Sequence, residues 1–185
     1  MTRNGDSAVG QGGFTIEPRD AEVDHVRGSP ARRLIVEYGD YERPYSRKAH
    51  RTIERVERRL GDRVRFALRH FPLTQIHSQA ASASAAAEAA ALQGRCWEMH
   101  ELLFHNESAL EPDDLGRYAA ELGLDLARFA EDQIGDRVRE RIARDVRTAV
   151  ESSEIRGTPT LSVDGEAHRG AYDAASLLDA LAKSA

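Results

Sequence analysis

The residues of this chain that could carry out chemistry gather at a turn between an expected strand and an expected helix. The turn reads Arg43-Pro44-Tyr45-Ser46 and follows the apolar run at 33–38. A serine hydroxyl becomes a nucleophile only beside a base, and His50, one helical turn after Ser46, could hydrogen-bond to it. An exposed or packed helix histidine is the simpler interpretation of His50. Arg43 carries a permanent charge and no nucleophilic atom.

Arg43 has two interpretations. A cation at a helix N-terminus opposes the helix dipole, at a cost of about 0.3–1 kcal/mol when exposed, and arginine is a poor capping residue. The favoured interpretation is therefore a tolerated surface residue. The alternative is a small anion site, in which Arg43 and the free N–H groups of the helix start hold a carboxylate opposite Pro159.

The elements around the turn form a β-α-β unit. Residues 32–38 have the apolar, β-branched character of a strand, and 64–71 alternate apolar and polar residues. Pro44 suits the first turn of the helix between them. Its apolar positions recur three or four residues apart, at Tyr45, Ala49, Ile53, Val56 and Leu60. This order favours two parallel strands joined by a right-handed crossover.

The rest of the chain is expected to be helical in the middle and β-β-α at the end. Helices are predicted at 78–92, 97–104, 112–122 and 126–134, followed by a longer helix with a stripe at Val138, Ile142, Val146 and Val150. Asp164-Gly165 predicts a hairpin turn between strands at 160–163 and 167–170. A final amphipathic helix is predicted at 174–183, and a short edge strand within 21–31.

Length and composition set the broad class. A chain of 185 residues fits one domain at 21–185, with a helical insert at about 77–153 and a flexible tail at 1–20. The net charge of −5 argues against nucleic acid as a main partner. No apolar run is long enough to span a membrane, and no secretory signal is visible. A single cysteine excludes an internal disulfide, so a cytoplasmic location is expected.

Several separated motifs occur in an order that resembles a known family. They are 34–42 with Pro44-Tyr45, then 69–73 with His77, then 97–104, 157–160 and 170–172. Together they resemble the DsbA-like thiol-disulfide oxidoreductases, in particular the bacterial branch sometimes fused to sodium/proton antiporters. The resemblance covers the chain from about residue 24 to its end. It implies a thioredoxin-like α/β fold with an all-helical insertion between its halves.

The resemblance also implies where the reactive groups would lie. The family's two active-site cysteines correspond to Arg43 and Ser46, and its cis-proline corresponds to Pro159 after Thr158. The family's first cysteine attacks from the helix N-terminus, and the second resolves the mixed disulfide. Neither thiol is present here, so dithiol catalysis is expected to be absent.

The expected function is therefore a redox-inactive module that binds a peptide or protein in the cleft beside the cis-proline. Its ligand-binding residues would be Arg43, Tyr45, Ser46, Thr158 and Pro159. One alternative is a glutathione-dependent transferase or isomerase on the same scaffold, which would use Ser46. Another is an oxidoreductase that works through the single cysteine, Cys96.

Cys96 and the histidines require separate interpretations. Cys96 precedes Trp97 at a helix start, and a partly buried structural cysteine is favoured over a reactive thiol flanked by Arg95. His100 and His105 are five residues apart and do not share a helix face. No spacing completes a metal site, so neither a metal nor another cofactor is expected, except glutathione under the alternative above.

Overall fold

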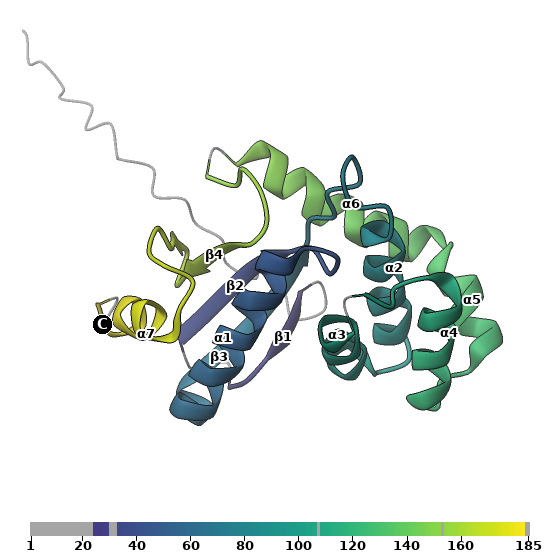
Figure 1. Cartoon of the computed structure of the whole chain (residues 1–185), viewed down its shortest axis with the longest axis horizontal. Helices are drawn as coiled ribbons and strands as arrows, with labels where there is room; N and C mark the ends of the chain where they lie inside the picture. The colour runs from purple at the N-terminus through teal and green to yellow at the C-terminus, as the bar shows by residue number, and fades with distance from the viewer. Residues whose placement is uncertain (1–23, 30–32, 107, 153, 184–185) are drawn as a thin grey trace, which may run out of the picture.

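The computed structural model describes residues 24–29, 33–106, 108–152 and 154–183. The tail expected at 1–20 lies outside these residues. Within them, the chain forms the expected thioredoxin-like order of β-α-β, helical insertion and β-β-α (Figure 1).

A mixed sheet forms the centre of the fold, with strand order β1-β3-β2-β4-β5. Its strands are β1 His25–Arg27, β2 Arg33–Gly39, β3 Val64–His70, β4 Thr160–Val163 and β5 Glu166–Ala167. β2 and β3 are parallel, as the β-α-β pattern predicts, and the other pairings are antiparallel. The strand expected within 21–31 is β1, which pairs with β3 at the sheet edge.

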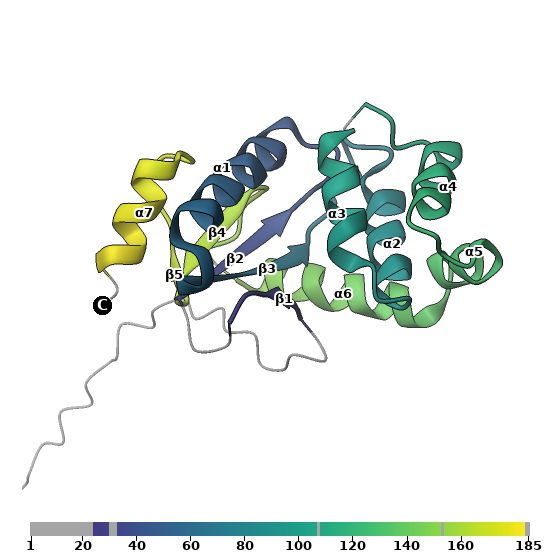
Figure 2. The same cartoon turned by 90° about the horizontal axis from the view of Figure 1, so that it is seen from below.

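The two faces of the sheet are covered by different helices. On one face, Ile35, Phe66 and Leu161 pack against α1 Pro44–Leu60 and α7 Ala174–Lys183 (Figure 2). A 3-10 turn, η1 Gly61–Arg63, joins α1 to β3. On the other face, Val36 and Tyr38 pack against α6 Asp136–Glu151. The alternation of side chains along each strand produces this division.

The helical insertion is built around α2 Ala80–Ala91. Its small alanine side chains are mostly buried, which lets the surrounding helices approach closely. Those helices are α3 Cys96–His105, α4 Pro112–Glu121, α5 Leu126–Gln133 and α6. α3 also lies beside α1, so the insertion and the β-α-β unit share one apolar core (Figure 2).

The last hairpin differs from expectation in length. Asp164 and Gly165 form its turn with φ of 48° and 89°, as Asp-Gly turns require. The return strand β5 covers only Glu166–Ala167 instead of 167–170. The backbone N–H of His168 still donates to the carbonyl of Leu161 in β4 (2.8 Å), and its ring donates to the carbonyl of Ala171 (3.1 Å) in the loop that follows.

Candidate functional site

The turn after β2 is organised by the buried carboxylate of Asp40. One oxygen accepts from the backbone N–H of Glu42 (2.9 Å), which closes the turn. The other accepts from the N–H of Leu73 (2.9 Å) and from Nδ1 of His77 (2.7 Å). The carboxylate of Glu42 in turn accepts from the N–H of Gln79 (2.7 Å). Both acidic groups beside the turn are therefore engaged in positioning it.

Arg43 lies at the N-cap position of α1 and makes no side-chain cap, as its residue type predicts. Its guanidinium carbon is 5.3 Å from the centre of the exposed Tyr45 ring. Its Nε is buried and, within the described part of the chain, has no hydrogen-bond partner. Arg43 thus presents a buried donor at the start of a helix.

Ser46 is fully buried, and its hydroxyl accepts from the backbone N–H of Asp40 (3.2 Å). The possible contact with His50 is not formed, because the His50 ring bonds to Glu101 and His100 instead. Ser46 therefore lacks the adjacent base that a serine nucleophile needs. Its role in the structure is to hold the first turn of α1.

The loop with Thr158 and Pro159 lies at the same end of the sheet as this turn. β4 starts at Thr160, whose partner in the register is Tyr38, just before the end of β2. The Thr158–Pro159 peptide bond is cis. The Thr158 hydroxyl is buried and unpartnered within the described residues, whereas the Pro159 carbonyl accepts from the Tyr172 hydroxyl (2.9 Å).

A hollow of about 300 Å³ lies beside this loop. Thr160 and Tyr172 line it, together with the exposed Arg156 and the neighbouring Arg169. The two predicted halves of the site thus lie at the same end of the sheet. The structure adds charged side chains that the sequence motifs did not point to, with Arg169 paired to Glu154 (2.6 Å).

A buried acid, Glu37, lies on β2 on the face that α1 covers. Neither carboxyl oxygen has a hydrogen-bond partner in the described residues. Burial raises the pKa of this group to about 8, against a smaller opposing effect of the Arg27 charge. The group is therefore protonated near neutral pH. Sequence reasoning overlooked Glu37, although a charged residue within an apolar strand is itself a signal.

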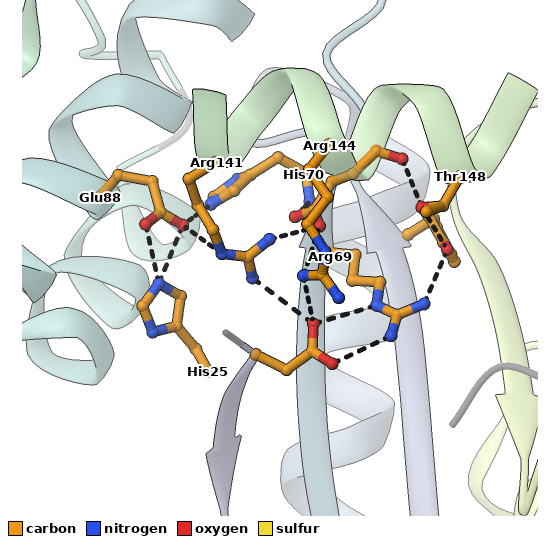
Figure 3. A network of polar contacts seen from close by, with 10 residues as sticks. His25, Arg69, His70, Glu88, Arg141, Arg144 and Thr148 are labelled. Atoms are coloured by element: carbon orange, nitrogen blue, oxygen red, sulfur yellow. Dashed lines mark hydrogen bonds and ion pairs between the residues drawn. The ribbon is translucent and has the colours of Figure 1, made fainter. Parts of the chain in front are cut away.

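A buried ion network joins β3, α6 and the segment before β1 (Figure 3). Arg69 donates to both oxygens of Asp24 (3.2 and 3.0 Å), and Arg144 donates to the same carboxylate (3.0 Å). Burial alone would raise the pKa of Asp24, but these two arginines lower it. Asp145 of α6 accepts from the N–H of His70 (2.9 Å), at the end of β3. The network fixes α6 against the sheet.

Cys96 lies at the first position of α3, half-buried, beside a second polar cluster. In this cluster Glu88 bonds to His25 (2.9 Å) and to His70 (2.7 Å), as Figure 3 shows. Burial alone would lower the pKa of His25, but hydrogen bonds to Cys96 and Glu88 raise it to about 10. The histidine next to the cysteine is therefore cationic at neutral pH. The sequence did not predict this pairing of Cys96 with His25.

One group of side chains within the described residues has the composition of a metal site. His50, Glu101 and His105 each place one ligand atom within 4.8 Å of the others. The sequence spacing of histidines alone had predicted no such group. None of the helices in the described part of the chain combines the length and apolar character needed to cross a bilayer.

Comparison with protein families gives one match over most of the chain. The model of the DSBA-like thioredoxin domain matches residues 34–182. Among solved structures, a thioredoxin-like oxidoreductase from Silicibacter pomeroyi has a TM-score of 0.77 and 26% identity, and covers 87% of this chain and 91% of its own. BdbD from Bacillus subtilis has a TM-score of 0.79 at 17% identity, over 92% of this chain and 97% of its own.

Curated relatives of higher identity are larger proteins. The Na(+)/H(+) antiporter NhaA 1 of Mycolicibacterium gilvum is 43% identical over 169 residues, which cover 90% of this chain and 27% of the relative. The Na(+)/H(+) antiporter NhaA 3 of Salinispora tropica is 45% identical over 163 residues, which cover 86% of this chain and 24% of the relative. The chain thus spans about a quarter of the length of these relatives.

Proposed function

This chain belongs to the DSBA-like thioredoxin domain family but has a single cysteine, and from that premise we propose that it is a redox-inactive binding module. In this proposal, a peptide or protein segment lies between the Arg43 turn and the Thr158-Pro159 loop. A dithiol cycle needs a second thiol to release the mixed disulfide. The positions that would supply the thiols hold an arginine and a buried, hydrogen-bonded serine.

The observation that carries the proposal is a pair of buried polar groups without partners. They are Nε of Arg43 and the hydroxyl of Thr158, in two loops at the same end of the sheet. An unsatisfied buried polar group costs about 1–3 kcal/mol. Two such groups at one edge of the fold are explained if a bound partner supplies hydrogen-bond acceptors, such as the carbonyl or carboxylate oxygens of an extended peptide.

Electrostatics favour an acidic segment as the partner. Asp40 and Glu42 are engaged with backbone and histidine donors, and no ion pair of Arg43 occurs among the described residues. The Arg43 charge therefore adds to the positive end of the α1 dipole instead of being neutralised. In the adjacent hollow Glu154 neutralises Arg169 (2.6 Å), and the exposed Arg156 adds one further positive charge.

Binding of a labelled peptide tests this proposal. An unstructured, fluorescein-labelled acidic peptide should bind more tightly than the same peptide with its carboxylates converted to amides. Arg43→Ala should weaken binding about tenfold or more, the usual value of a hydrogen bond to a charged group. Arg58→Ala, which removes the same charge from the exposed far end of α1, is the matched control. Equal losses in the two variants, or none in Arg43→Ala, would contradict the proposal.

A second candidate function rests on Cys96. This cysteine is half-buried at the first position of α3, beside the cationic His25. The thiolate would attack a disulfide sulfur of a partner, form a mixed disulfide and release the other sulfur as a thiolate. A thiol of a second molecule would then have to resolve it. Disulfide exchange that Cys96→Ser abolishes would favour this function, whereas the glutathione alternative gains no support because Ser46 lacks a base.

We also propose a cytoplasmic location, supported by the single cysteine. Structural disulfides are typical of exported proteins and rare in reducing compartments. Fractionation of the natural host should recover the domain on the cytoplasmic side. Recovery on the outer side of the membrane would contradict this part of the proposal.

A further inference from the structure

We propose that His50 of α1 and Glu101 and His105 of α3 form a binding site for Zn²⁺. The three residues hold one ligand atom each within 4.8 Å of one another. Two imidazoles and one carboxylate make up a donor set that zinc uses in sites with an open fourth position. The site does not include the residues of the Arg43 turn. Zinc binding can therefore be tested independently of the proposed peptide binding.

The distances suit a tetrahedral ion. His50 Nε2 lies 3.0 Å from Glu101 Oε2, and His105 Nδ1 lies 3.9 Å from the same oxygen. Ligand atoms about 2.0–2.2 Å from a tetrahedral zinc ion lie about 3.4 Å apart, a value between these two distances. His105 Nδ1 now bonds to the backbone carbonyl of Glu101 (2.7 Å), so binding requires the His105 ring to give up this contact and rotate toward Glu101 Oε2. The ion would replace the proton of the hydrogen bond between His50 Nε2 and Glu101 Oε2.

Each of the two inner ligands is held by a further contact. His50 Nδ1 lies 3.2 Å from Nε2 of the buried His100, whose Nδ1 lies 3.1 Å from the Tyr41 hydroxyl. Arg27 donates to Glu101 Oε1 (2.7 Å), which leaves Oε2 directed to the site. Arg27 also pairs with Glu57 (2.6 Å), so its charge is balanced by a second carboxylate. Supporting contacts of this kind orient the ligands in metal sites and fix the histidine tautomer.

The site is buried on the side of His50 and open to solvent on the side of His105. His50 is buried under α3, Glu101 is partly exposed, and His105 is exposed in the last turn of α3. An ion can therefore enter from solvent beside His105. Once bound, it would connect the helix that carries the Arg43 turn to the helical insertion. Imidazole donors favour zinc and its transition-metal neighbours over Mg²⁺, which prefers oxygen ligands.

Calorimetric titration of the full chain with ZnCl₂ tests the proposal, with MgCl₂ as the second probe. We expect one Zn²⁺ per chain, no comparable binding of Mg²⁺, and a rise in melting temperature that a chelator reverses. His105→Ala should lower the Zn²⁺ affinity at least tenfold, and because His105 is exposed this variant should keep the fold. His168→Ala, a histidine on the final hairpin, is the matched control and should bind like the parent chain.

Glu101→Gln provides the second variant, since it keeps the shape of the side chain but removes the charge. We expect it to lose zinc binding as His105→Ala does. The proposal is overturned if the parent chain shows no saturable 1:1 binding at millimolar Zn²⁺. It is also overturned if His105→Ala binds as tightly as the parent, or if His168→Ala loses as much affinity as His105→Ala.

Discussion

The buried carboxyl of Glu37 should make the stability of this protein fall as the pH rises. Its pKa is about 8 in the folded chain against an ordinary value of 4.5. Between these two values the folded state binds more protons at this group than the unfolded state does. Stability therefore decreases with rising pH in that window, and the full benefit of the protonated form is present only below it.

The size of the effect follows from the two pKa values. From about pH 5 to pH 8, the linkage relation gives a loss of roughly 3.5 kcal/mol from this one group, since one pKa unit corresponds to about 1.36 kcal/mol. No discount for solvent screening applies, because Glu37 is 0% exposed. Glu37→Gln replaces the carboxyl with a neutral amide of the same shape and removes this term.

Urea unfolding of both proteins at pH 5 and pH 8 measures the effect. The stability of Glu37→Gln relative to the parent should increase by roughly 3–4 kcal/mol between the two pH values. Glu121→Gln, the same change at an exposed position of α4, should show no such trend. A relative change below about 1 kcal/mol for Glu37→Gln would mean that the carboxyl ionises normally and that the burial argument is wrong.

Three further predictions concern the turn and the ion network. The parent chain should not catalyse insulin reduction, because it has one thiol; turnover well above that of free glutathione would contradict this. Arg43→Cys combined with Ser46→Cys should form a disulfide across the helix start, with a first thiol whose pKa lies below about 8.5, as thiol titration would show. Asp24→Ala should lower the free energy of unfolding by about 3–5 kcal/mol, because Arg69 and Arg144 lose the buried carboxylate that both contact. Urea unfolding measures this loss, and a value under about 1 kcal/mol would show that the network contributes little to stability.

The sequence predicted the elements of the fold closely, because local patterns determine them. The strand expected at 64–71 is Val64–His70, and the helix expected to begin at Pro44 spans Pro44–Leu60. Period-two alternation and a proline at a helix start need no knowledge of distant residues. The parallel pairing of β2 with β3 followed from the same local order.

The face that α6 buries was not predictable from its apolar stripe. Val138 is buried as the stripe suggests, but Val150 is 71% exposed and the inner face carries Asp145 and Ala149. Asp145 is buried because it accepts from the N–H of His70 and pairs with Arg141. Tertiary contacts with the end of β3, absent from the helix's own sequence, decided the orientation.

The side-chain clusters that could bind a metal or react could not be predicted from the sequence, because they also depend on tertiary contacts. The turn and the Thr158-Pro159 loop were predicted, because whole motifs mark them. The pairs His25–Glu88 and His50–Glu101, in contrast, join residues 63 and 51 positions apart. No local spacing brings such residues together. Histidine spacing within one helix therefore predicted no metal ligands, although His105 and Glu101 are joined by His50 from another helix.

The most direct test of the proposed binding role is a nuclear magnetic resonance titration of the ¹⁵N-labelled chain with the acidic peptide. If the peptide lies between the turn and the opposing loop, the backbone N–H signals of Arg43, Tyr45 and Ser46 should shift together with those of Thr158 and Thr160. These shifts should saturate at one peptide per chain. The Nε–H of Arg43 should become protected from exchange with solvent. Shifts confined to other surfaces, with these two segments unchanged at saturation, would contradict the account.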